Sequence, residues 1–222
     1  MSVASKIAEV NATLPAGTRL VAVSKYHPVE AIREAYEAGQ RLFGESHVQE
    51  VVAKQEALPK DIEWHFIGHL QTNKVKYIVP FVTLIHSVDT LKLLEEIEKQ
   101  AEKSQRTVNC LLELHIAQEN TKFGFTIDSL RQLMQQKAFD QYGHICFKGL
   151  MCMATHTDNE EEIRAEFHSI STFFAECKNY MADFTELSMG MSNDYKIAIT
   201  EGSTLVRVGT YIFGERDYSK KQ

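Results

Sequence analysis

Lys25 occupies a position in the sequence that favours covalent chemistry. It follows the apolar run LVAV, which predicts a strand buried on both faces. Because side chains alternate along a strand, Lys25 shares a face with Val21 and Val23, and its amine lies where the strand ends. A neutral lysine amine forms a Schiff base with an aldehyde. A lysine at a strand end is also commonly a solvated or ion-paired residue, so its neighbours decide between the two interpretations.

Two later segments, SMGMSND and RVGT, have the composition of anion-binding turns. Gly190 permits a tight turn, and Ser192 offers a hydroxyl at the start of a predicted helix, whose free N–H groups attract an anion. Gly209 allows the close approach of a ligand, and Thr210 supplies a second hydroxyl. Taken singly, Ser192 could equally cap its helix, and Gly209 could mark a bulge. Together the two segments indicate a phosphate site.

Arg207 lies two residues before Gly209 and therefore on the same strand face. Its guanidinium stays charged at any working pH, and a nearby cation lowers the pKa of a lysine amine. A nucleophilic lysine beside a phosphate site favours a Schiff base with a phosphorylated aldehyde. If the aldehyde is carried on a pyridine ring, the charge of Arg207 near the ring nitrogen would oppose protonation of that nitrogen. The ring would then withdraw electrons only weakly.

Strand and helix patterns alternate along the chain and must position these residues. The strand patterns cover residues 20–23, 40–46, 63–68, 81–88, 108–116, 145–153, 186–191 and 205–214. Helical patterns lie between them at 29–39, 47–58, 72–77, 91–104, 126–138, 157–180 and 193–201, and another precedes the first strand. Eight alternating units predict an α/β fold, a single (β/α)8 TIM-type barrel with an additional N-terminal helix.

Local signals refine this prediction. Thr157 and Glu160 have the spacing of a capping box for the longest helix, and Asp89 or Thr90 can cap the helix at 91–104. The alternative fold, a doubly wound open sheet, would place GxGxxG after the first strand, where this chain has SKYHP. Because no linker divides the sequence, residues 1–222 are expected to form one domain.

Closure of the barrel would bring the candidate residues together. The active face of such a barrel lies at the carboxyl ends of its strands, and phosphate groups bind after the seventh and eighth. The eighth strand becomes the neighbour of the first, so Lys25 is expected to face the same mouth as Ser192 and Thr210.

The bulk composition limits the class of partner. A net charge of -6 argues against a nucleic-acid-binding protein, which normally carries a basic face. No apolar run approaches the roughly 20 residues that span a bilayer, and the N-terminus lacks the apolar core of a secretory signal. We therefore expect a cytoplasmic protein. The four cysteines form no CxxC pair and are expected to be reduced.

Seven sequence blocks together resemble the pyridoxal phosphate homeostasis protein family, relatives of the first domain of alanine racemase. They follow one another in the expected order: LVAVSK, FGESHVQE, WHFIGHLQTNK, HSVD, GLM, LSMGMSND and STLVRVGTYIFGER. The resemblance implies a single α/β barrel that binds pyridoxal 5'-phosphate (PLP) and acts in intracellular vitamin B6 homeostasis. It also implies that Lys25 carries PLP as an internal aldimine, that Arg207 faces the pyridine nitrogen, and that Ser192, Gly209 and Thr210 bind the phosphate.

One block departs from the family pattern. Where the family commonly has FGENYVQE, this chain has FGESHVQE, so Ser46 replaces an asparagine and His47 a tyrosine. Ser46 remains a candidate ring contact, but its side chain is shorter and has no amide. Any contact that the asparagine makes is expected to be lost or bridged by water.

Two function classes fit these residues. A carrier would bind PLP without turnover and supply it to PLP-dependent apoenzymes, as a monomer or weak dimer with no catalytic residue. A racemase or lyase acting on small amino acids would need acid/base groups on both faces of the substrate, with Lys25 on one face and His65 or a tyrosine on the other. A third possibility, aldolase-type chemistry without a cofactor, would form a Schiff base only with a sugar phosphate.

Other charged and metal-binding residue types give weaker signals. Four of the nine histidines fall near predicted strand ends: His65, His69, His86 and His115. They form no HxH or HExxH pattern, so no metal site is predicted. Three lysines, Lys122, Lys220 and Lys221, are expected to be solvated, with transfer of cofactor at the mouth as their alternative role.

Overall fold

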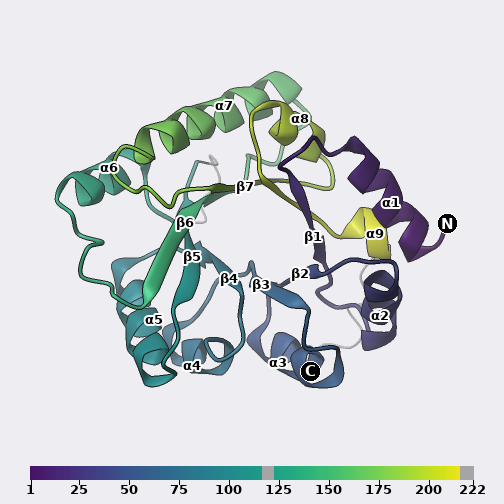
Figure 1. The fold of residues 1–222 in the computed structure, drawn as a ribbon. Coiled ribbons are helices and arrows are strands. Elements are labelled where there is room, and N and C mark those ends of the chain that lie inside the picture. The colour runs from purple at the N-terminus through teal and green to yellow at the C-terminus, as the bar shows by residue number, and fades with distance from the viewer. Residues whose placement is uncertain (117–122, 216–222) are drawn as a thin grey trace.

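Eight parallel strands close into a barrel in the computed structural model, which describes residues 1–116 and 123–215 (Figure 1). Each strand pairs with the next along the chain, and the eighth pairs with the first. The predicted TIM-type barrel is confirmed, and the open-sheet alternative is wrong. The strands are β1 (Arg19–Val23), β2 (Leu42–Glu45), β3 (Glu63–Phe66), β4 (Leu84–Val88), β5 (Val108–Leu114), β6 (Ile145–Cys152), β7 (Glu186–Met191) and β8 (Leu205–Val208).

Helices surround the barrel, and α1 precedes the first strand as predicted (Figure 1). They are α1 (Val3–Thr13), α2 (Val29–Glu37), α3 (Val48–Ala57), the 3-10 helix η1 (Thr72–Lys74), α4 (Val75–Ile78), α5 (Leu91–Lys103), α6 (Ile127–Gln135), α7 (Glu160–Cys177), α8 (Tyr195–Thr200) and α9 (Thr210–Phe213). None of the helices in the described ranges combines the length and the apolar character that crossing a bilayer requires.

Two apolar layers stabilise this arrangement. The inner layer fills the barrel with residues from alternate strand positions, Val21, Leu84, Leu111, Met151 and Leu205. The outer layer packs the sheet against the helices. In α5, for example, Leu94 and Ile97 are fully buried, and the side chain of Thr90 caps the helix by accepting a hydrogen bond from the amide of Leu93 at 3.2 Å.

Two local predictions, one at the start of α7 and one at the end of β8, are wrong. The N-cap of α7 is Asn159, whose side chain accepts hydrogen bonds from the first-turn amides, so Thr157 and Glu160 form no capping box. The hydroxyl of Thr157 instead accepts a hydrogen bond from the amide of Asn159. The last strand ends at Val208 rather than at residue 214, because the chain turns at Gly209 into α9.

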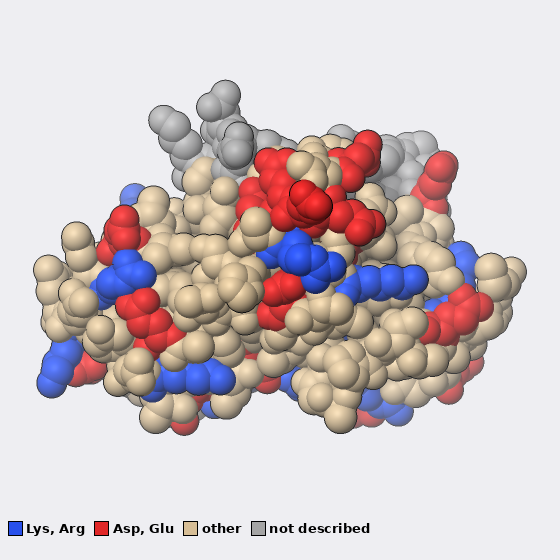
Figure 2. Space-filling model, turned by 90° about the horizontal axis from the view of Figure 1, so that it is seen from above, with Lys and Arg blue, Asp and Glu red and all other residues tan. Residues whose placement is uncertain are grey.

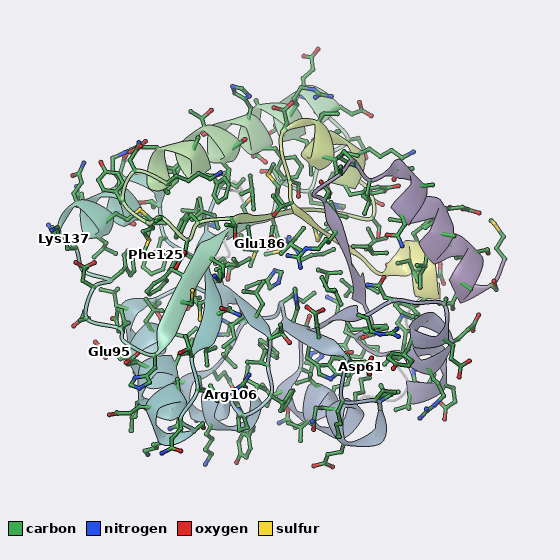
Figure 3. All side chains as sticks on the ribbon, in the orientation of Figure 1. Asp61, Glu95, Arg106, Phe125, Lys137 and Glu186 are labelled. Carbon is green, nitrogen blue, oxygen red and sulfur yellow. The ribbon has the colours of Figure 1, made fainter. Side chains whose placement is uncertain are left out.

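The seam between β1 and β8 joins segments far apart in the sequence. Val21 lies beside Arg207 in this parallel pair. At the amino ends of the strands, Arg19 forms an ion pair with Glu186 of β7 at 2.5 Å. Figure 3 labels Glu186. The hydroxyl of Thr204 donates to the other carboxylate oxygen of Glu186 at 2.9 Å. Side-chain contacts therefore join the strands at their amino ends. At their carboxyl ends, the chain continues into loops.

Gly149 in β6 is a position where only glycine fits. A Cβ built there would lie 1.7 Å from the carbonyl oxygen of Glu186, and the φ of Gly149 is +153°. We expect Gly149→Ala to lower the free energy of unfolding by about 3 kcal/mol or more, because the pairing of β6 with β7 must open. Urea denaturation followed by circular dichroism measures this loss.

Gly143→Ala is the matched control. A Cβ at Gly143 would come no closer than 3.8 Å to its nearest neighbour, Glu98 Oε1. This variant should stay within about 0.5 kcal/mol of the wild type. Equal stabilities of the two variants would contradict the packing described for Gly149.

Candidate functional site

A cavity of about 670 Å³ opens at the carboxyl ends of the strands, and all six predicted site residues line it. They come from the turn after β1, from β8 and from the loops after β2, β7 and β8: Lys25, Ser46, Ser192, Arg207, Gly209 and Thr210. The amine-bearing turn and the segments that follow β7 and β8 therefore reach one cavity, as closure of the barrel predicts.

Lys25 lies two residues beyond the end of β1, on a half-buried turn that leads into α2. The next residue, Tyr26, has a φ of +66°, a left-handed conformation that costs a non-glycine residue roughly 1–2 kcal/mol. Its backbone N–H donates to Glu50 Oε1 of α3 at 2.6 Å, and this charge-assisted hydrogen bond offsets the cost. A contact from a neighbouring helix therefore fixes the turn that carries Lys25.

The loop after β7 differs from the predicted helix start. Helix α8 begins at Tyr195 with Asp194 as its N-cap residue, so Ser192 precedes the helix and does not cap it. Gly190 has a φ of +92°, and a Cβ there would lie 2.5 Å from the Cβ of Ala198. Gly190 lies within β7 and not in the turn at residues 192–194, so its backbone conformation serves to pack the strand against α8.

Ser192 and Gly209 join the two loops. The backbone N–H of Gly209 donates to Ser192 Oγ at 3.4 Å, so a hydroxyl of one loop lies beside an amide of the other. A Cβ at Gly209 would lie 2.9 Å from the carbonyl oxygen of Val23. The close approach that requires this glycine is therefore that of β8 to β1, independently of any ligand. Thr210, the first residue of α9, is exposed at the cavity wall.

Arg207 is buried at the wall of the cavity and is held by uncharged acceptors. Nη1 donates to the carbonyl oxygen of Ser188 at 2.9 Å and to its hydroxyl at 2.5 Å, and Nη2 donates to the carbonyl oxygen of Cys152 at 2.9 Å. Burial lowers the pKa of Arg207, while Cys152, Asp194 and Glu113 act in the opposite direction. Among the described residues its charge is not neutralised by an ion pair, so the cavity has a cationic wall.

A chain of buried hydrogen bonds leads from Arg207 across the barrel. In the arrangement that gives every ring proton an acceptor, Nδ1–H of His65 donates to Nε2 of His86, and Nδ1–H of His86 donates to the hydroxyl oxygen of Ser188, both at 2.9 Å. Burial lowers the pKa of both histidines, that of His65 to about 3. Both rings are therefore neutral and orient Arg207 without adding charge.

The remaining candidate ligands for a metal are dispersed. His69 pairs with Asp89 at 3.1 Å, and His115 lies half-buried after β5. Across residues 1–116 and 123–215, no three His, Cys, Asp or Glu side chains are grouped as metal ligands would be. Lys122, Lys220 and Lys221 lie outside the described residues.

Sequence reasoning missed the loop after β6, residues 153–158, which lines the cavity. Thr155 is held by Glu166 of α7, whose carboxylate accepts hydrogen bonds from its amide at 2.8 Å and from its hydroxyl at 2.6 Å. Asp158 and Glu160 also line the cavity. Figure 2 looks onto the α7 and α8 side of the molecule and shows acidic side chains gathered on that side. No glycine or motif marks this loop, so only the fold reveals its role.

Comparison with known proteins assigns the chain to a family. The family model described as alanine racemase, N-terminal domain, matches residues 2–217. The pyridoxal phosphate homeostasis protein of Aquifex aeolicus is 42% identical over 202 residues, which cover 90% of this chain and 88% of that protein. The chain belongs to the pyridoxal phosphate homeostasis protein family. The pyridoxal phosphate homeostasis protein of Escherichia coli K12 is 38% identical over 214 residues, which cover 93% of this chain and 89% of that protein.

A solved structure of the family has the same fold. PipY of Synechococcus elongatus with PLP bound matches with a TM-score of 0.89 and 39% identity, over 96% of this chain and all of that chain. The PLP-free structure of PipY matches with a TM-score of 0.91. The expected resemblance is therefore confirmed at the level of the family and the barrel.

The departure from the family's FGENYVQE block now has a structural context. Ser46 lines the cavity, and a Cβ at Gly68 would lie 2.7 Å from its Cβ, so the loop after β3 packs directly on it. His47 lies outside the cavity lining among described residues. Its Nε2 is 3.2 Å from the hydroxyl of Tyr26, and its Nδ1 is 3.4 Å from Glu50 Oε2. His47 therefore contacts the turn that carries Lys25.

Glu113 gives this family member a pH-dependent stability. Burial, followed by the charge of Asp89, raises the pKa of Glu113 to about 7, while Arg207 acts in the opposite direction. The unfolded chain loses this proton near the ordinary pKa of 4.5, before the folded chain does. The stabilising contribution of Glu113 is therefore complete below the unfolded pKa and is lost as the pH rises through the folded pKa, by roughly 3 kcal/mol.

Glu113→Gln should remove this loss. Relative to the wild type, the variant is expected to gain roughly 3 kcal/mol of unfolding free energy between about pH 4 and about pH 8, measured by urea denaturation at both values. Glu161→Gln, which changes an exposed carboxylate of α7, is the control and should show no such gain. If the difference in unfolding free energy between Glu113→Gln and the wild type does not vary with pH, the raised pKa of Glu113 is contradicted.

Proposed function

We propose that this chain binds PLP as a Schiff base on Lys25 and acts in intracellular PLP homeostasis as a carrier without catalytic turnover, with PLP-dependent apoenzymes as recipients. One observation carries the proposal: Lys25, Arg207 and the joined loops of Ser192 and Thr210 line a single cavity. The names of its relatives and the PLP bound to PipY support the choice of ligand.

The residues of the cavity fit the functional groups of PLP. The hydroxyls of Ser192 and Thr210 suit a phosphate ester, and the amine of Lys25 suits an aldehyde. The cavity volume of about 670 Å³ lies in the range of about 300–1,000 Å³ that is usual for small-molecule sites. Bound PLP supplies an aldehyde carbon for imine formation and a ring that withdraws electrons when its nitrogen is protonated.

Arg207 favours holding the cofactor over strong carbanion chemistry. Its hydrogen-bond acceptors are the neutral groups of Ser188 and Cys152, so its charge remains available to the cavity. A cation placed at the pyridine nitrogen opposes protonation of that nitrogen and weakens the ring as an electron sink.

Racemase or lyase activity is the alternative, and it needs an acid/base group on the second face of the substrate. His65 is buried against His86, and neither it nor any tyrosine belongs to the described lining of the cavity. His156, in the loop after β6, does line it. The alternative function therefore predicts turnover that depends on both Lys25 and His156.

Lys25→Ala should abolish the visible absorption band of the PLP-loaded protein, because the Schiff base cannot form. Borohydride reduction and peptide mapping of the wild type should place the cofactor on Lys25. Lys60→Ala, which changes an exposed lysine, is the control and should keep the band. An unchanged band in Lys25→Ala would show that another lysine carries PLP.

An amino-acid racemisation assay on the same proteins separates the two functions. No turnover by the wild type is expected. Turnover that disappears in both Lys25→Ala and His156→Ala would overturn the carrier function in favour of the enzyme.

Thr210→Val should weaken PLP binding about tenfold without moving the absorption band. The substitution removes one hydrogen bond to a charged phosphate, worth about 1.5 kcal/mol, and leaves Lys25 intact. Equilibrium dialysis measures the dissociation constant, and Thr172→Val, at an exposed position of α7, is the matched control. Equal affinities for the two variants would remove Thr210 from the phosphate site.

A further inference from the structure

A cluster of charged side chains is buried behind the turn that carries Lys25. Lys54 of α3 is 4% exposed, and Glu45 at the end of β2 is fully buried. Lys54 Nζ donates to the carbonyl oxygen of Ser24 at 2.8 Å, to Glu45 Oε1 at 2.7 Å and to Glu50 Oε1 at 2.6 Å. These three hydrogen bonds use every N–H donor of the ammonium group.

The cluster holds the residues on both sides of Lys25. Ser24, which precedes it, is fully buried, and its hydroxyl donates to Glu45 Oε1 at 2.6 Å while its carbonyl accepts from Lys54. The amide of Tyr26, which follows it, donates to Glu50 Oε1, the same oxygen that accepts from Lys54. We call Ser24, Glu45, Glu50 and Lys54 the Lys54 clamp.

Packing alone does not account for the Lys54 clamp. Elsewhere on its buried face, α3 contacts the barrel through Val48 and Val51. The clamp sets two carboxylates against one ammonium, and Glu45 Oε2 has no hydrogen-bond partner in the described part of the chain. Burial raises the pKa of Glu45 to about 7 although Lys54 opposes the rise. Apolar residues would join helix and sheet at lower cost, so the contacts to the Lys25 turn are the specific result of this arrangement.

We propose that Lys54 is a positioning residue for Lys25: through Glu45, Glu50 and Ser24 it fixes the backbone on both sides of this lysine and so directs its amine to the PLP aldehyde. The proposal rests on the proposed function, because it assigns Lys54 a part in forming the Schiff base. It concerns the reaction of the amine and not the binding of the phosphate, since the clamp does not touch Ser192, Gly209 or Thr210.

Lys54→Met tests the proposal, because it keeps an unbranched apolar stem of similar length and removes the ammonium group with its three donors. Stopped-flow absorption should show Schiff-base formation with PLP slowed about tenfold. Affinity for pyridoxine 5'-phosphate, which has the same ring and phosphate but no aldehyde, should change less than twofold. Lys54→Arg, which restores a cation and its donors, should recover part of the rate.

Lys99→Met is the matched control, since Lys99 is a helical lysine that pairs with Glu96 on the surface of α5. It should leave both measurements unchanged. An equal loss for PLP and pyridoxine 5'-phosphate in Lys54→Met would indicate a structural role only, and an unchanged rate would exclude positioning; either result overturns the proposal.

Glu50→Gln decides the question if Lys54→Met does not fold. It keeps the size of the side chain and weakens the bonds to Lys54 and Tyr26, so the rate with PLP should fall about threefold while affinity for pyridoxine 5'-phosphate stays the same. An unchanged rate in this variant overturns the proposal. Wild-type protein that forms no Schiff base at Lys25 would overturn the proposed function itself, whereas a normal wild type with unaffected variants overturns only the role of Lys54.

Discussion

The pairing of β1 with β8 is the constraint on which the candidate site depends. It sets Val21 beside Arg207 and so brings the turn that carries Lys25 close to Thr210 at the start of α9. Gly209 permits this contact, because any side chain there would meet the carbonyl oxygen of Val23. Without closure, Lys25 and Thr210 would belong to opposite ends of an open sheet, and no common cavity would exist.

The local sequence predicts the elements well where one pattern controls them. Period-two alternation places Val21 and Val23 on one face of β1, with Lys25 on the turn beyond the end of this strand. The eight strand patterns predict the barrel because helical patterns between successive strands allow those strands to run parallel. Prediction fails where two local signals compete. Asn159 caps α7 although Thr157 has the capping-box spacing, and the apolar residues after Gly209 form a helix although they have β propensity.

The candidate site shows the same division between local and long-range information. Glycine and hydroxyl residues identify the two loops, but the partner of Ser192 is an amide in the other loop, which no local pattern reveals. The sequence gives one indication of the role of Lys54, which is its position on the otherwise apolar face of α3. Its partners come from the residue after β1, from β2 and from its own helix, so the arrangement becomes visible only when the strands are in register.

The pairing of β1 with β8 also has a consequence for stability if the cavity holds a ligand. Under the proposed function, a molecule bonded to Lys25 and held by Thr210 would link the turn after β1 to the start of α9 across the β1–β8 pairing. Such a ligand would stabilise the folded state by mass action, so opening of the β1–β8 pairing and departure of the ligand would be coupled. The lifetime of this protein would then follow the abundance of the molecule that it holds.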